Sequence, residues 1–243
     1  MGSKPLSHGE NELGLGLQPL WHPSPNFGPR KQDAKPDLVV IHYTAMADAN
    51  AALDVLCDET CEVSAHYLIA KDGTVYQLVE ETERAWHAGA GQWRDIADVN
   101  SRSIGIELCN DGYSPFSHSL MNSLETLLSG IVSRWAIPPA GVIGHSDLAP
   151  GRKIDPGRKF DWLRLADQGL AIQASAQAPC PAGAFRKLAI KAGYTADVPD
   201  TTLLEAFRLR HRPWGIGPLC EDDLCIMSGL IHALGLAPED TNA

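Results

Sequence analysis

One continuous apolar run decides the fold, and the polar residues after it point to a site: Leu38-Val39-Val40-Ile41-His42-Tyr43-Thr44. Three of its first four residues are β-branched, and such a run is typical of a strand that is buried on both faces of a sheet. Functional side chains are commonly displayed where a buried strand ends. We therefore predict an interior strand that presents His42 at its end.

Segments around this strand complete a sheet. An Asp72-Gly73 turn between two strand-forming runs, 65–70 and 74–79, predicts an antiparallel hairpin. The other elements expected in this part of the chain are strands at 103–108 and 141–144 and helices at 48–56, 119–135 and 160–165. The expected fold class is α/β, with a mixed central β-sheet flanked by helices.

Composition divides the chain into parts. The polar start, rich in Pro and Gly up to residue 36, is expected to be extended, and residues 172–181 have the Ala, Gln, Ser and Pro of a linker. Short helical patterns follow at 184–191, 201–209 and 222–234. The predicted parts are an N-terminal arm (1–20), an α/β domain (21–171), a linker (172–181) and a small all-helical domain (182–238).

Charge and hydropathy narrow the class of partner. The net charge of -10 over 243 residues argues against a general binder of nucleic acid or of anionic membranes. No apolar run is long enough to cross a bilayer, and the first 20 residues lack the order of a secretory signal. The expected location is the cytoplasm, or outside it if a signal once preceded this start. The six cysteines lack zinc-module spacing and are interpreted as free thiols.

A loop rich in Gly and Pro, residues 144–157, carries an imidazole, an ammonium and two carboxylates. Such a loop can hold a rigid irregular shape, so His145 and Asp155 could converge on a metal. Two His and one carboxylate with an open fourth position form a common catalytic zinc site. The candidate ligands in this part of the chain are His42, His66, His87, His145 and Asp155. Residue types and spacing alone do not choose among the four histidines.

Several ordered motifs carry a resemblance to a known family. They are Ser24-Pro25-Asn26-Phe27, Val40-Ile41-His42-Tyr43-Thr44, Ser64-Ala65-His66-Tyr67, Trp86-His87-Ala88-Gly89, Ser103-Ile104-Gly105-Ile106-Glu107, Gly144-His145-Ser146-Asp147 and Arg152-Lys153-Ile154-Asp155-Pro156-Gly157. Together they resemble the zinc-dependent N-acetylmuramoyl-L-alanine amidases of bacteria, the type 2 amidases, which are related to peptidoglycan-recognition proteins. The match covers roughly residues 20–170 in order, which makes it far more specific than a single motif.

The resemblance implies roles for individual residues. His42, His145 and Asp155 match the ligands of one Zn²⁺ per chain. Glu107 matches the catalytic carboxylate, which we expect to be ionised near neutral pH and to move a proton from water to the leaving amine. Lys153 matches a cationic partner that stabilises the charge developing on the lactyl carbonyl oxygen.

Other polar and aromatic residues of the motifs are assigned to the substrate cleft or to the layer behind the ligands. The predicted substrate-binding residues are His66, His87, Trp86, Trp93 and Asn100. A buried hydrogen-bonded role is an equal alternative for His66, which precedes an apolar run. Asp147 is interpreted as support for the loop rather than as a fourth ligand.

The implied function is hydrolysis of the amide between the lactyl group of N-acetylmuramic acid and L-alanine. The missing signal favours anhydro-muropeptides of cell-wall recycling as substrate, whereas a second domain is more typical of enzymes that meet the polymer. A non-catalytic recognition protein and a zinc peptidase acting within the stem peptide are the alternatives. The expected partners are peptidoglycan or its fragments.

The helical domain resembles, more weakly, a peptidoglycan-binding helical module. The resemblance rests on Ala192-Gly193-Tyr194, Asp200-Thr201-Thr202, Ala206-Phe207 and Arg212-Pro213. Where that module usually has Gln after Ala-Phe and His-Phe before Arg-Pro, this chain has Arg208 and Arg210-His211. Wall binding and a purely packing role therefore both stay open for this domain.

Overall fold

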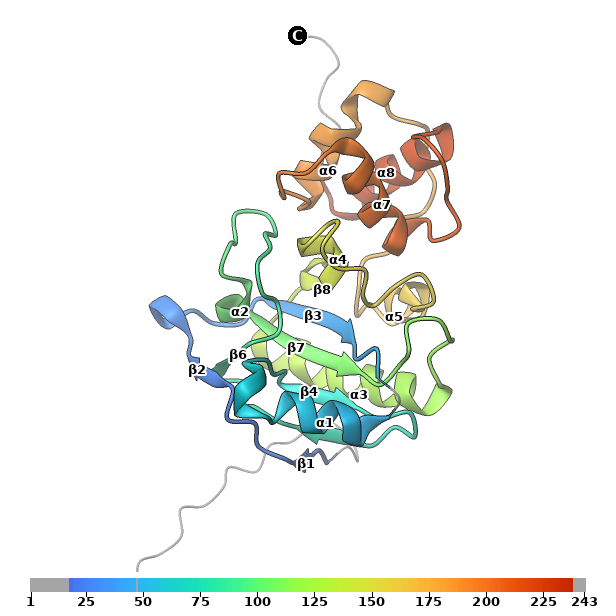
Figure 1. Ribbon diagram of the computed structural model, residues 1–243. Helices are drawn as coiled ribbons and strands as arrows, with labels where there is room; N and C mark the ends of the chain where they lie inside the picture. Colours follow the sequence, from blue (N-terminus) through green and yellow to red (C-terminus); the bar gives the residue numbers. More distant parts are fainter. Residues whose placement is uncertain (1–17, 47, 238–243) are drawn as a thin grey trace, which may run out of the picture.

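A computed structural model describes residues 18–46 and 48–237 of the chain (Figure 1). The strands are β1 (Leu20–Trp21), β2 (Phe27–Pro29), β3 (Leu38–Tyr43), β4 (Tyr67–Ile69), β5 (Val75–Gln77), β6 (Glu83–Ala85), β7 (Ser103–Leu108) and β8 (Val142–Gly144). The α-helices are α1 (Ala49–Leu56), α2 (Val99–Arg102), α3 (His118–Trp135), α4 (His145–Leu148), α5 (Trp162–Asp167), α6 (Phe185–Ala192), α7 (Asp200–His211) and α8 (Glu221–Ala233). Short 3₁₀ helices are η1 (Lys31–Asp33), η2 (Glu59–Cys61), η3 (Pro139–Gly141) and η4 (Ala182–Ala184).

The main sheet is mixed, as predicted, with strand order β1-β5-β4-β7-β3-β8. β4 and β5 form the antiparallel hairpin, whereas β4, β7, β3 and β8 run parallel to one another. A separate antiparallel pair joins β2 to β6. The register places His42 of β3 directly opposite Glu107 of β7, so two predicted site residues are neighbours at the same end of the sheet.

Apolar side chains cover both faces of the sheet. Helix α3 packs on one face, where Leu124, Leu127 and Ile131 are fully buried with Val39 and Ile41 of β3. Helix α1 lies on the opposite face (Figure 1). The prediction that β3 is buried on both faces is confirmed, because all of its first five residues are buried.

The N-terminal segment is more tightly packed than expected. Most of the predicted arm, 1–20, lies outside the described residues, but Leu20 belongs to β1, which pairs in parallel with β5. The buried Asn26 donates from Nδ2 to the carbonyl oxygens of Asp58 and Val63, both at 2.8 Å. The described part of this segment is therefore attached to the domain, because its polar side chains satisfy buried backbone groups.

The predicted linker, 172–181, is also packed rather than free. The backbone N–H of Gln177 donates to the carbonyl of Cys225 in α8 at 3.1 Å. Gly229 of α8 approaches the segment so closely that a Cβ there would lie 1.6 Å from the carbonyl oxygen of Ser175. The composition of a linker does not exclude packing, because small residues also permit close backbone contact.

The three helices α6, α7 and α8 share one apolar cluster with the α/β part of the chain. Trp93, in the loop before α2, packs edge to face on Tyr194, with ring centroids 5.0 Å apart. Figure 1 shows the helical region next to β8 and α4. All six cysteines are free thiols, and within residues 18–46 and 48–237 no helix is long and apolar enough to span a membrane.

Candidate metal centre and cleft

Two neighbouring strands bring the predicted histidine ligands together. His42 lies near the end of β3, and His145 begins α4 directly after β8, which is the parallel neighbour of β3. The loop after α4 returns to the same edge of the sheet with Asp155. Nδ1 of His42 and Nδ1 of His145 lie 2.9 Å apart, and each lies 3.0 Å from Oδ2 of Asp155.

These three atoms form a set that could hold a metal ion, since all the potential ligand atoms lie within 4.8 Å of one another. Metal bonds of about 2.0 to 2.1 Å in a tetrahedron place ligand atoms roughly 3.3 Å apart, close to the observed separations. Two imidazole nitrogens and a carboxylate oxygen that face one another are three electron-pair donors directed at one point. The residues present therefore fit a divalent metal of the zinc type.

The second nitrogen of each ligand histidine is bound by a group behind it. Nε2 of His145 donates to the carbonyl oxygen of Ala88 at 2.9 Å. Nε2 of His42 donates to Nδ1 of His87 at 3.0 Å, and Nε2 of His87 in turn donates to Oγ of Ser103 at 3.1 Å. These bonds select the tautomer in which both Nδ1 atoms keep a lone pair for the metal.

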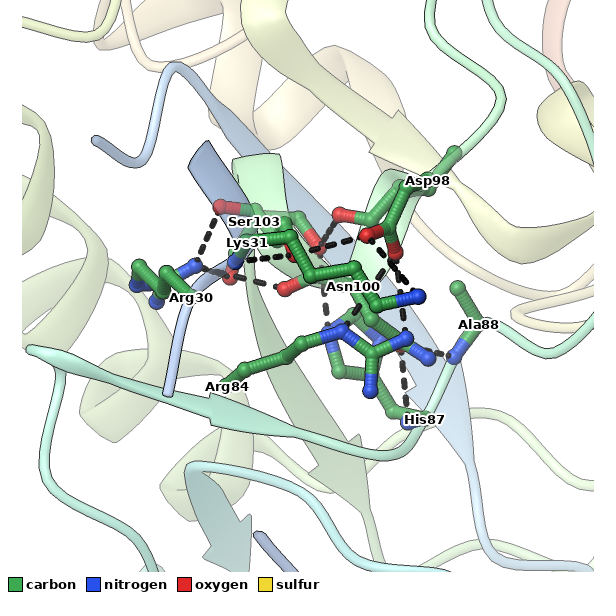
Figure 2. Close-up of polar contacts among 10 residues, drawn as sticks. Arg30, Lys31, Arg84, His87, Ala88, Asp98, Asn100 and Ser103 are labelled. Atoms are coloured by element: carbon green, nitrogen blue, oxygen red, sulfur yellow. Dashed lines mark hydrogen bonds and ion pairs between the residues drawn. The ribbon is translucent and has the colours of Figure 1, made fainter. Parts of the chain in front are cut away.

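A glycine makes room for the His87 ring over the sheet. A Cβ at Gly105 of β7 would lie 2.4 Å from Cγ of His87, so a larger residue at this position would displace the imidazole. Asn100 of α2 holds the loop that carries this histidine, because its Oδ1 accepts from the backbone N–H groups of His87 at 3.1 Å and Ala88 at 2.8 Å (Figure 2). Asn100 thus supports both groups that orient the ligands.

Burial and charge set the protonation of this cluster. Burial, followed by the nearby His145, lowers the pKa of His42 to about 4, which favours the neutral imidazole that a metal requires. Burial opposes ionisation of Asp155, but the close contacts of its Oδ2 with His145 and His42 outweigh burial and lower the pKa of that carboxyl. The cluster therefore offers a neutral imidazole at His42 and a carboxylate at Asp155.

Glu107 enters the same cleft from β7. Its Oε2 is buried and has no hydrogen-bond partner among the described residues. Burial, and then the negative charge of Asp155, raise the pKa of Glu107 to about 8, against the opposing charge of Lys153. Without a metal, burial therefore favours the protonated form of Glu107 despite the charge of Lys153. That Glu107 is ionised near neutral pH beside a bound zinc stays a prediction.

The cleft has a volume of about 370 Å³. Its polar and aromatic walls include Tyr43, Ser64, Trp86, His87, Glu107, Arg152 and Lys153 beside the three ligands. Arg152 donates from Nη2 to the carbonyl oxygen of Ala88 at 2.7 Å. The cleft thus combines a candidate metal centre, an acidic group and cationic groups on one edge of the sheet.

Comparisons of the sequence and of the fold with known proteins all point to one family. The sequence profile of the N-acetylmuramoyl-L-alanine amidase family matches residues 32–158. This chain belongs to that family. The N-acetylmuramoyl-L-alanine amidase AmiD of Escherichia coli strain K12 is 37% identical over 209 residues, which cover 72% of this chain and 75% of that protein.

Solved structures extend the similarity over both parts of the chain. The complex of E. coli AmiD with anhydro-N-acetylmuramic acid-L-Ala-D-gamma-Glu-L-Lys matches with a TM-score of 0.75 at 31% identity, covering 85% of this chain and 93% of that one. AmpDH3 of Pseudomonas aeruginosa in complex with anhydromuramic pentapeptide also gives 0.75, at 29% identity, with 88% and 96% covered. Coverage of this extent includes the helical region as well as the amidase sheet.

Within this amidase, some predicted substrate residues lie away from the cleft. His66 is fully buried, and its Nδ1 accepts from the backbone N–H of Gly105 at 3.0 Å while Nε2 donates to the carbonyl of Glu83 at 3.1 Å. His66 thus has the buried, hydrogen-bonded role that the sequence left open as the alternative to substrate contact. Trp93 is only 4% exposed and packs on Tyr194, so the structure does not place its ring where a sugar or peptide would contact it.

Asn100 is likewise buried behind the cleft, whereas Trp86 and His87 line it. Sequence reasoning named Asn100 for substrate contact and did not identify Ser103 or the Ala88 carbonyl as parts of the site. Their positions depend on how the loop between β6 and α2 folds back over β7. The Trp86-His87-Ala88-Gly89 motif indicated that this loop belongs to the site. It did not indicate which side chain or backbone atom of each residue contacts the ligand histidines.

Proposed function

We propose that this amidase uses one Zn²⁺, held by His42, His145 and Asp155, to hydrolyse the amide between the lactyl group of anhydro-N-acetylmuramic acid and L-alanine. The observation that carries the proposal is the convergence of these three ligand atoms in the cleft that Glu107 lines, where its Oε2 has no hydrogen-bond partner among the described residues. The proposal also draws on the substrates named for the AmiD and AmpDH3 complexes. The substrate pool would be soluble muropeptides released during cell-wall recycling.

The bound zinc would supply a Lewis acid that acidifies water and polarises the scissile carbonyl. Glu107 would accept the proton of the attacking water and deliver it to the leaving amine of L-alanine. The products are the free lactyl carboxylate and the intact stem peptide. A cation beside Glu107 favours its ionised form, which opposes the burial that raises its pKa to about 8 in the metal-free protein.

Lys153 would act on the other side of the reacting carbonyl. It lines the cleft together with Glu107 and Asp155, and its charge lowers the pKa of both Glu107 and His42. A fixed ammonium at this place would stabilise the negative charge that develops on the carbonyl oxygen. Trp86 and His87 would contact the substrate from the cleft wall.

The decisive experiment compares two substrates. Purified protein with one equivalent of zinc is incubated with soluble anhydro-muropeptide and, separately, with intact sacculi, and the released stem peptide is measured by mass spectrometry. We expect rapid release of intact stem peptide from the soluble substrate. A strong preference for sacculi would favour the polymer as substrate, and a shortened peptide would indicate a peptidase instead.

A non-catalytic recognition protein would release nothing from either substrate, although it could still bind them. Cytoplasmic location stays a prediction from the sequence, and fractionation of cells that produce the native chain would test it. Both measurements use the full chain, because the helical region shares its apolar core with the amidase sheet.

A further inference from the structure

A fully buried carboxylate lies two residues after a proposed metal ligand. Asp147, in the single turn of α4, has no exposed surface, and its Oδ2 accepts from the backbone N–H of Gly144 at 2.8 Å. This bond closes the turn that begins at His145. The shape of the turn, and with it the direction of the His145 imidazole, therefore depends on where the Asp147 carboxylate is held.

The helical region supplies the other partners of this carboxylate. The hydroxyl of Tyr194, which follows α6, donates to Oδ1 of Asp147 at 2.8 Å. Arg210 of α7 donates from Nη1 to Oδ2 at 2.9 Å, and its Nη2 donates to the carbonyl of Ile172 at 2.9 Å. Tyr194 and Arg210 are 1% and 5% exposed, so the whole cluster is shielded from water.

Arg210 also packs against helix α5 of the amidase part of the chain. Its guanidinium carbon lies 4.2 Å from the ring centre of Trp162 in α5. A Cβ placed on Gly144 would lie 3.4 Å from that same ring. The arginine thus contacts the ligand turn by a charged hydrogen bond and, through the tryptophan, by packing against the residue before His145.

We propose that Arg210 and Tyr194 are positioning residues for the metal centre, and that the helical region serves to hold the His145 turn through Asp147. This inference rests on the proposed zinc site. The physical reason is that a buried carboxylate without its cation would rearrange to reach water or another donor. Because it caps the turn, its rearrangement would move the ligand. Groups behind metal ligands commonly change metal affinity by about 10- to 100-fold when removed.

The same helix contains a matched control. Arg208 is 2% exposed and pairs with the fully buried Asp223 at 2.9 Å through Nε. A second bond to Asp223 comes from Nη2, and the remaining bonds go to the carbonyl oxygens of Gly217 and Pro218, at 2.7 and 3.0 Å. Both arginines are buried in α7 and both pair with a buried aspartate, but the partners of Arg208 all belong to the helical region.

The test measures metal binding by the full chain rather than turnover. Metal-free wild type, Arg210→Met, Tyr194→Phe and Arg208→Met are titrated with Zn²⁺ against a chromogenic chelator, and visible spectra are recorded after loading with Co²⁺. We expect Arg210→Met to raise the zinc dissociation constant about 10- to 100-fold and Tyr194→Phe to raise it less. Both should alter the Co²⁺ spectrum. Arg208→Met should lower the Tm but keep the dissociation constant within about twofold.

Arg210→Lys, which keeps a charge near Asp147, should fall between wild type and Arg210→Met, and it replaces the latter if that variant does not fold. Zinc affinities and Co²⁺ spectra of the Arg210 and Tyr194 variants equal to wild type would overturn the proposal. So would an equal loss of zinc affinity in Arg208→Met, since that indicates general destabilisation. A wild-type protein that binds zinc but cleaves no muropeptide would contradict the proposed function alone.

Discussion

The two faces of strand β7 have different roles: one packs in the apolar core, and the other faces the cleft. On one face, Ile104, Ile106 and Leu108 are fully buried and pack with α3. On the other face, Glu107 lines the cleft. Gly105 leaves space for the ring of His87, and Oγ of Ser103 is hydrogen-bonded to it. Because successive side chains of a strand point to opposite faces, residues that stabilise the core alternate along β7 with residues that face the cleft. Substitutions on the two faces should therefore have separable effects.

The largest expected effect comes from the proposed metal ligands at the cleft edge. Asp155→Ala should abolish both stoichiometric zinc binding and amidase activity, and chelation of the wild type should do the same reversibly. Zinc content by atomic absorption and peptide release together check this. Asp161→Ala is the control, because Asp161 caps α5 and its loss should cost about 1 kcal/mol of stability with zinc retained. Activity that survives in zinc-free Asp155→Ala would contradict the assignment.

On the cleft face of β7, Glu107→Gln should lower kcat by about 10²- to 10⁴-fold. The unfolding free energy of the metal-free protein should not fall, since Glu107 has no hydrogen-bond partner for its Oε2. Glu81→Gln is the matched control. Glu81 is buried and accepts from Nη2 of Arg134 and Nε1 of Trp135, both at 2.6 Å, so this variant should lose stability and keep its kcat. An unchanged rate in Glu107→Gln excludes the proposed proton transfer.

On the opposite face, Leu124→Ala in α3 should lower the unfolding free energy by about 3 kcal/mol, because it leaves a cavity under the sheet. The side chain is fully buried among apolar residues. Below the melting transition, kcat should stay near the wild-type value. Urea unfolding and steady-state kinetics on the same preparation measure both quantities. A large fall in kcat without loss of stability would show that the two faces are not separable.

The smallest effect concerns His66, whose Nδ1 accepts from the backbone N–H of Gly105 in β7. Burial, and then the charge of Arg30, lower the pKa of His66 to about 3. The neutral ring therefore contributes stability that is fully present above the unfolded pKa of about 6.5 and is lost as the pH falls toward 3. Between pH 6.5 and pH 5, this single group should cost about 2 kcal/mol.

His66→Asn keeps an acceptor for the N–H of Gly105 but does not titrate, so its unfolding free energy should fall less between these pH values. The measurement is urea unfolding of the metal-free proteins at both pH values. The two proteins share all other titrating histidines, so the difference between them isolates His66. Equal losses in the two proteins would mean that His66 is not held neutral in the folded state.

Much of the fold was predictable because its signals are local. The β-branched run at 38–41, the Asp72-Gly73 turn and the apolar spacing of 119–135 each act within a few residues, and each predicted element is present. The same holds for the helix cap at Asp48, whose carboxylate accepts from the N–H of Ala51. The one-turn helices α2 and α4 were not predicted, since four residues carry no measurable period.

The family motifs took the prediction of the site further than composition could. They selected His42, His145 and Asp155 from five candidates, and in the structure one potential ligand atom of each residue lies close to those of the other two. They did not reveal that Trp93 packs into the helical region or that Asn100 supports the His87 loop. A motif records which residue types occur, whereas a contact depends on the path of loops that lie far apart in the sequence.

The sequence by itself determined the longer helices, the central strands and the residue types that can hold a metal, because these depend on local patterns and on chemistry. Only the tertiary structure decided that Oε2 of Glu107 is buried without a hydrogen-bond partner among the described residues, that His87 orients His42, and that Arg210 reaches Asp147 across 63 positions of chain. These properties arise when distant segments exclude water from one another, and no stretch of sequence contains that information alone.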